Sequence, residues 1–142
     1  MIKLKRAYEP ASRSDGYRVL VERLWPRGVR KQALPLDGWD KELAPSHELR
    51  KWFAHDPAKW SEFKQRYRHE LKDRAVAERL HELAARASHD TVTLVFSSHD
   101  TEHNNAVVLK QELTEASSRS RRARSSTSPG TGDSARRRRR SP

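Results

Sequence analysis

The sequence predicts an α/β fold, built as a small, mostly parallel sheet flanked by helices and followed by a disordered basic C-terminal tail. Two apolar runs, residues 17–21 and 91–96, have the composition of buried strands. Helical apolar periodicity fills residues 57–87 between them, a length that allows a crossover between parallel strands. The end of the chain contains almost only Ser, Arg, Pro, Gly and Thr, which bury too little apolar surface to fold. We therefore expect one α/β domain over residues 1–116 and a disordered tail over residues 117–142.

Three strands are expected before the helices. Residues 2–8 alternate apolar side chains with lysines, which is the period of a strand with one solvated face. Residues 17–21 are richer in apolar side chains and predict a more central strand, which leads into a loop containing arginine, tryptophan, proline and glycine. A third strand is expected over residues 34–36, at an edge or an end, because Pro35 lacks a backbone donor.

Two signals for the start of a helix follow. Ser46 is placed as the N-cap of a short helix over residues 47–54, and Asp56 precedes Pro57 in the same way. The pattern leaves open whether residues 57–87 form one helix or two. The aromatic residues of this region recur at helical spacing and therefore indicate core rather than a base-stacking platform; they are Trp52, Phe53, Trp60, Phe63 and Tyr67.

The strand over residues 91–96 is followed by a polar connector and a final helix. That helix is expected to begin near residue 103 and to end, with the folded part of the chain, near residue 115.

The positive charge is concentrated in the tail. Of the formal net charge of +11, residues 117–142 supply nine arginines against one aspartate, 9 − 1 = +8, so the first 116 residues carry only +3. The high net charge therefore predicts nucleic-acid binding for the tail and not for the first 116 residues. The arginine run that would contact phosphates is Arg136, Arg137, Arg138, Arg139 and Arg140.

Composition also excludes several classes of chemistry. The chain has no cysteine, which rules out disulfides, thiolate metal ligands and a cysteine nucleophile. It has neither the apolar core of a signal peptide nor a run approaching the ~20 apolar residues of a membrane span. We expect a cytoplasmic protein with no membrane partner.

A candidate site follows from the predicted sheet. If strands 17–21 and 91–96 are parallel neighbours, the loops that leave their C-terminal ends lie on one edge, where open α/β sheets bind ligands. Guanidinium groups beside the amides of a helix N-terminus suit a phosphate or a carboxylate. The alternative is that the arginines form ion pairs with Glu22, Asp37 or Asp40 while the tryptophan only packs. The residues that the two loops bring to this edge are Arg23, Trp25, Arg27, Ser98, His99, Asp100, Asn104 and Asn105.

The second loop also invites a metal or a nucleophilic interpretation. His99, Asp100 and His103 contain histidines at i and i+4, but they straddle a loop and a helix start with no third histidine nearby. Side chains that are adjacent in the chain point apart, which argues against a triad. We expect a solvated loop here, with no metal and no cofactor.

Three sequence blocks together resemble a known family. They cover residues 14–28 (SDGYRVLVERLWPRG), 36–46 (LDGWDKELAPS) and 103–109 (HNNAVVL). The chain is similar from residue 1 to about 115 to the YeaO-like branch of the bacterial domain of unknown function family 488. The resemblance implies a small cytosolic α/β protein with no assigned activity. Its recurrent positions fall on Arg23, Trp25, Pro26, Arg27, Gly28, Trp39, Lys41, Glu42, Pro45, Asn104 and Ala106.

The chain departs from the family pattern at two positions. Glu22 stands where the family usually has Asp, and His99 stands where a Lys is expected. The broader family also carries a Cys-His-Arg group near the start of the last helix. The present chain, which lacks cysteine, cannot perform thiol chemistry there.

The functional expectation is a small-ligand module that binds an anionic or phosphate-bearing molecule, with catalysis left open. Arg23 and Arg27 would hold the anion, and Trp25 would shape the site. No general base stands out among Glu22, His99 and Asp100. The alternatives are a nucleic-acid-associated protein, which would use the basic loop and tail, and a protein-interaction domain. Orientation and support would come from Asn104, Asn105, Lys41 and Glu42.

Overall fold

A four-stranded, fully parallel sheet forms the centre of the computed structural model, which describes residues 1–126 and the side chains of residues 1–119. The strand order is β1-β4-β2-β3, so that the chain crosses over between strands that are not sequential neighbours. Every residue of β4 is buried, as expected for a central strand covered on both faces. The predicted α/β fold is confirmed. The strands are β1 (Ile2–Arg6), β2 (Tyr17–Leu20), β3 (Gly38–Trp39) and β4 (Val92–Phe96).

The third strand lies elsewhere than the sequence pattern predicts. The prediction over residues 34–36 is wrong, because β3 comprises only Gly38–Trp39, paired with β2. Pro35 cannot donate to a ladder, and its carbonyl accepts a hydrogen bond from Arg18 Nε at 2.8 Å. Leu34 is 3% exposed and packs as core below the sheet. This segment is therefore anchored by side-chain contacts and not by strand pairing.

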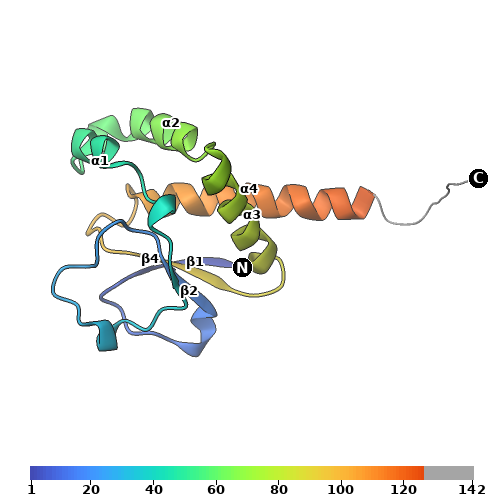
Figure 1. Cartoon of the computed structure of the whole chain (residues 1–142), viewed down its shortest axis with the longest axis horizontal. Coiled ribbons are helices and arrows are strands. Elements are labelled where there is room, and N and C mark those ends of the chain that lie inside the picture. Colours follow the sequence, from blue (N-terminus) through green and yellow to red (C-terminus); the bar gives the residue numbers. More distant parts are fainter. Residues whose placement is uncertain (127–142) are drawn as a thin grey trace, which may run out of the picture.

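The four α-helices of residues 1–126 lie on one side of the sheet, where α3 and α4 pack against the strands and α2 packs against α4 (Figure 1). α1 begins after Ser46, whose Oγ accepts the Leu49 N–H at 3.1 Å, so this predicted N-cap is confirmed. Residues 57–87 form two helices, because α2 ends at Glu70 and Asp73 caps α3. The helices are α1 (His47–Phe53), α2 (Trp60–Glu70), α3 (Arg74–Ala87) and α4 (Asn105–Ser126).

The segment after Asp56 differs slightly from the prediction. Pro57–Lys59 is a turn of 3-10 helix capped by the Asp56 side chain, and the α-helix itself begins at Trp60. The predicted aromatic core is confirmed, since Phe53 and Phe63 stack with their ring centroids 4.3 Å apart.

The opposite face of the sheet is covered by a long loop, which contains one turn of 3-10 helix (Lys31–Ala33), and not by α-helices. Residues 21–37 run across it, as the blue to cyan trace shows in Figure 1. Its apolar side chains cover a small second core, in which Leu20 and Val95 are fully buried. The loop is therefore part of the folded structure. Its packing holds in place residues 23–27, which contribute to the candidate site.

α4 extends the folded region past the expected boundary. Ala116 still packs against the main core and Ser117 is 4% exposed, so the helix stays in contact with the domain at the point where the tail was expected to begin. The helix continues to Ser126 and projects beyond the other elements (Figure 1). The rest of the predicted disordered tail, residues 127–142 with its arginine run, lies outside the described residues.

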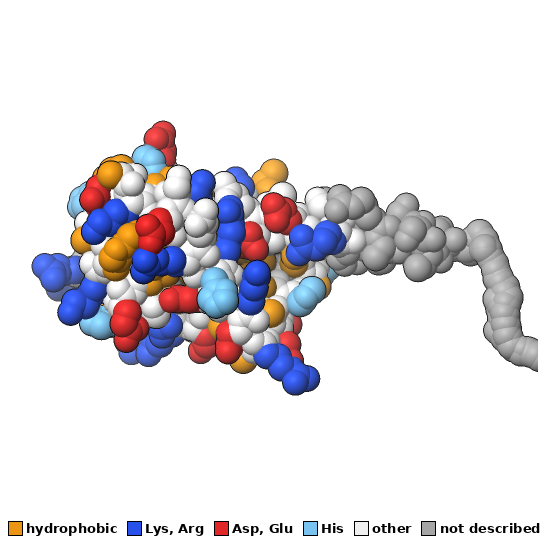
Figure 2. Space-filling view, turned by 90° about the horizontal axis from the view of Figure 1, so that it is seen from above, with side chains coloured by type: hydrophobic (Ala, Val, Ile, Leu, Met, Phe, Trp, Pro, Cys, Tyr) orange, Lys and Arg blue, Asp and Glu red, His pale blue; other side chains and the backbone are white. Residues whose placement is uncertain are grey.

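The surface of the helical face has mixed charge. Lys and Arg side chains are interspersed with Asp and Glu over it (Figure 2). None of the helices within residues 1–126 combines the length and the apolar character needed to cross a bilayer.

Candidate functional site

A cavity of about 340 Å³ opens at the C-terminal edge of the sheet. Arg23 and Ser97, which follow β2 and β4, contribute to its wall, together with the end of α1 and the start of α4. β2 and β4 are parallel neighbours, with Leu20 opposite Val95, so the loops that follow them leave the sheet side by side. This is the position at which open α/β sheets bind ligands.

The structure brings five of the eight predicted site residues to this cavity. The three others lie outside its lining. Lys41 places its Nζ 4.2 Å from the ring centroid of Trp39, Glu42 is exposed, and Asp100 is occupied within its own loop. The residues that line the cavity are Arg23, Trp25, Arg27, Asn104 and Asn105.

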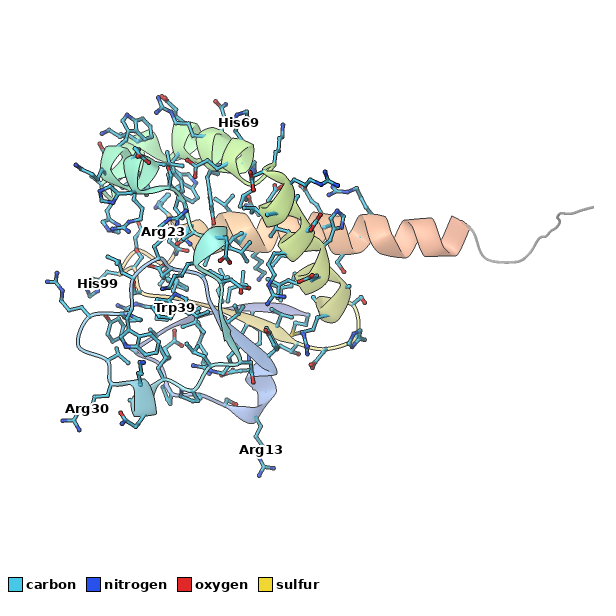
Figure 3. The ribbon with its side chains drawn as sticks, viewed as in Figure 1. Arg13, Arg23, Arg30, Trp39, His69 and His99 are labelled. Atoms are coloured by element: carbon cyan, nitrogen blue, oxygen red, sulfur yellow. The ribbon has the colours of Figure 1, made fainter. Side chains whose placement is uncertain are left out.

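Arg23 is held in place by backbone carbonyls. Its Nε donates to Pro45 O at 2.9 Å and its Nη2 to Ala44 O at 3.4 Å. Figure 3 shows Arg23 between α1 and the sheet, whereas Arg13 and Arg30 extend away from the body of the protein. Carbonyl contacts orient a guanidinium without neutralising it, so the charge of Arg23 remains available to the cavity.

The alternative interpretation of the arginine loop required ion pairs that do not form. Within the part of the chain whose side chains are described, Arg23 and Arg27 form no salt bridge with any carboxylate. Asp40, one of the proposed partners, instead pairs with Arg79 at 2.8 Å. Asp37 accepts the backbone N–H of Arg18.

Trp25 is fixed by its own loop. Its Nε1 donates to Val29 O at 2.6 Å, and its ring meets Trp39 edge to face with centroids 5.5 Å apart. The Trp39 Nε1 donates in turn to Glu22 O at 2.6 Å. The two indoles therefore hold the backbone at Glu22, before Arg23, and at Val29, after it.

The contribution of α1 to the cavity is not visible in the sequence pattern. Arg50, Lys51 and His55 line the cavity, although a helical pattern identifies only the apolar face of this short helix. Ala54 and His55 both have positive φ, 48° and 57°, which turns the chain sharply after α1 and sets His55 at the cavity. Such backbone costs of order 1–3 kcal/mol per residue and is commonly retained near functional sites. No sequence signal marks it, because neither residue is a glycine.

Glu22 is the only carboxylate among the described residues that line the cavity. Its Oε1 accepts a hydrogen bond from Ser97 Oγ at 3.1 Å. Burial raises the pKa of Glu22, and the hydrogen bonds from Ser97 and the positive charge of Arg50 only partly offset that effect. The cavity therefore contains a strong acceptor beside its cations.

The two asparagines anchor the start of α4. Asn104 Oδ1 accepts the Val107 N–H at 3.1 Å, as an N-cap does, and its Nδ2 donates to Asp100 O at 2.9 Å. Asn105 Nδ2 donates to Val21 O at 2.7 Å and ties the helix to the end of β2. Both side chains line the cavity while holding its walls together.

The histidines of the connector have separate partners. Asp100 accepts the N–H groups of Glu102 and His103, and its Oδ2 lies 2.9 Å from His103 Nδ1. These hydrogen bonds lower the pKa of Asp100. His99 Nδ1 instead lies 3.4 Å from Arg6 Nη2. Among the described residues, no three His, Asp or Glu side chains are grouped so as to hold a metal ion.

The electrostatic balance of the cavity is positive. Arg50 and Lys51 join Arg23 and Arg27 in its lining, and within residues 1–119 none of the four forms a salt bridge. The lining thus contains four cationic residues, all of them exposed, and one carboxylate, Glu22. A concave site lined mainly by one sign of charge focuses the field on its interior.

Comparisons with known proteins identify the family of this chain. A family model described as "Inactive DUF488-N3 subclade" matches residues 1–131. The chain is 45% identical over 113 residues to the uncharacterized protein YeaO of Escherichia coli (strain K12), a match that covers 79% of this chain and 96% of that protein. It is 40% identical over 112 residues to the uncharacterized protein Rv3073c of Mycobacterium tuberculosis, covering 79% and 92%. No solved structure matches the chain significantly. The protein therefore belongs to the bacterial DUF488 family, in its YeaO-like branch.

Proposed function

We propose that this protein is a small-ligand-binding module whose cavity binds an anionic, phosphate-bearing molecule. The observation that carries the proposal is the convergence of four cationic side chains without salt-bridge partners on one cavity, namely Arg23, Arg27, Arg50 and Lys51.

Physical chemistry favours an anion at this place. Like charges brought together repel one another, and a bound phosphate would relieve that repulsion while accepting charge-assisted hydrogen bonds. Arg23 is already oriented by two carbonyls, so little side-chain entropy would be lost when it binds. The volume of about 340 Å³ lies within the range of small-molecule sites.

The proposal is for binding and not for turnover. The matching family model is described as inactive, and the chain has no cysteine for covalent chemistry. Glu22 and His103 line the cavity, and each has a hydrogen-bonding partner in the protein, Ser97 for Glu22 and Asp100 for His103. We place this binding function in the cytoplasm. The chain has no cysteine, so it forms no disulfides and needs no oxidising compartment.

Calorimetry on the full chain with inorganic phosphate and pyrophosphate tests the proposal. We expect Arg27→Gln and Arg50→Gln each to weaken binding by about tenfold, the value of one charge-assisted hydrogen bond. Arg30→Gln is the matched control, because this arginine is exposed and points away from the cavity (Figure 3). Equal effects of the three substitutions, or no binding of either anion, would contradict the proposal.

A shortened chain separates the cavity from the basic tail. Residues 127–142 contain five of the arginines on which nucleic-acid binding would depend, and a chain that ends at Ser126 keeps every described element. If the cavity is the site, the shortened chain binds phosphate as the full chain does. If the tail is the agent, the shortened chain binds nucleic acid more weakly and with a less steep salt dependence, because it keeps only four of the nine tail arginines.

A further inference from the structure

We infer that the ligand carries, in addition to its anionic group, a nitrogen that donates a hydrogen bond, and that Glu22 accepts it. This inference rests on the proposed function, since it concerns the same cavity. It adds the chemical class of the ligand: a phosphate ester whose other end bears an amino group.

The position of Glu22 gives the first reason. Its backbone carbonyl is held by Trp39 Nε1 at 2.6 Å and its side-chain Oε1 by Ser97 Oγ at 3.1 Å, so both ends of the residue are fixed. The carboxylate forms no salt bridge with any described cation, although Arg23 and Arg50 line the same cavity. An ionised carboxylate has about four acceptor positions, which leaves capacity for a ligand.

The sign of its charge gives the second reason. A carboxylate inside a site for a bare anion would repel the anion and weaken its binding. Burial already disfavours the ionised form of Glu22, and this raises its pKa. A donor on the ligand would offset both costs, because it would add a second hydrogen bond to the one from Ser97.

The shape and lining of the cavity give the third reason. At about 340 Å³ it is much larger than a single phosphate ion. Phe53 and Phe63, which are 6% and 2% exposed, contribute an apolar wall. Such a lining suits a ligand with a carbon framework that joins two polar ends.

Two matched pairs of ligands test the inference by calorimetry on the full chain. Phosphoethanolamine is compared with propyl phosphate, and adenosine monophosphate with purine riboside monophosphate, which lacks the exocyclic amine. We expect the amine-bearing member of at least one pair to bind about tenfold more tightly, because its hydrogen bond to a carboxylate is charge-assisted. The pair that shows the preference distinguishes an aminoalkyl phosphate from a nucleotide.

Glu22→Gln identifies the acceptor, since glutamine keeps the size and the acceptor for Ser97 but loses the charge. The substitution should abolish the preference for the amine-bearing phosphate. Inorganic phosphate should bind to the variant as tightly as to the wild type, or more tightly. Glu42→Gln is the control, because this exposed acid lies outside the cavity. Phosphate binding without any preference for the amine, or a preference that survives in folded Glu22→Gln, overturns this inference alone. Failure of every phosphate compound to bind overturns the proposed function as well.

Discussion

Asp15→Asn should destabilise the protein strongly, because Asp15 is the buried centre of a charge cluster. The carboxylate is 0% exposed and accepts hydrogen bonds from Lys3 and Lys5 at 3.0 Å and from Arg18 Nη1 at 2.6 Å. Asparagine preserves the shape but leaves three cations without their counter-charge. Lys3 retains 31% of its side-chain exposure and Lys5 16%, so these two can still reach water, whereas Arg18 at 7% cannot.

The magnitude follows mainly from Arg18. Breaking a buried pair by removing one partner costs about 3–5 kcal/mol, and the contributions of the more exposed lysines are reduced by solvent. We therefore expect a loss of about 3 kcal/mol in the free energy of unfolding measured by urea denaturation, which is a large part of the stability of an average domain. Asp90→Asn, which removes a half-exposed partner of Arg86, is the control and should cost less than about 0.5 kcal/mol.

The pH dependence provides an independent check. Burial opposes the ionisation of Asp15, but the hydrogen bonds from Lys5, the Ser12 N–H, Lys3 and Arg18 outweigh it and lower the pKa of Asp15 far below its usual range. A lowered carboxyl pKa contributes stability above the unfolded-state value, near 3.8, and that stability is lost as the pH falls toward the folded-state value. The difference between wild type and Asp15→Asn should therefore shrink by about 1 kcal/mol between pH 6 and pH 3. A difference below about 1 kcal/mol at pH 7 would refute the reasoning.

Three further predictions concern the backbone and the cavity. Gly16→Ala should cost at least about 2 kcal/mol in urea denaturation, because its φ is +62° and a Cβ would lie 2.3 Å from Thr91 O; an unchanged midpoint would contradict this. Ala54→Gly should raise stability by about 0.5 kcal/mol, since glycine relieves the positive φ of 48° at an entropic cost; a lowered melting temperature would show that the turn is not strained. The preference for an amine-bearing phosphate should be present at pH 7.5 and vanish on acidification at a pH above 4.5, because the pKa of Glu22 is raised from that value and its protonated form carries no charge. A preference that persists unchanged down to pH 4.5 would exclude Glu22 as the acceptor.

Much of the fold follows from local patterns in the chain. The N-caps at Ser46 and Asp56 and the apolar periodicities place the starts of the helical segments within a few residues, because capping and amphipathicity are encoded within one or two turns. The break between α2 and α3, which Asp73 caps, was left open by the same patterns. The candidate edge was also predictable, since loops after adjacent parallel strands share one edge of the sheet. That rule placed Arg23, Arg27 and Asn104 together, and all three line the cavity.

Local patterns could not locate β3 or the end of the last helix. The run at residues 34–36 has the composition of a strand, but Leu34 is used as core and Pro35 as an acceptor for Arg18. α4 passes the change in composition at residue 116 because the helix still packs on the domain there. In both places a contact with a distant element overrides the local preference.

Local sequence patterns were enough to predict most of the elements, the parallel sheet and the arginine loop at its edge. The set of charged residues that line the cavity depends instead on how the elements pack together. α1 was expected merely to bury its apolar side, yet its docking brings Arg50 and Lys51 to the cavity, while Lys41 and Glu42 remain outside it. The cavity lining escapes prediction because propensity, capping and periodicity act over only a few residues. The convergence of side chains on a cavity depends on how elements far apart in the chain pack together.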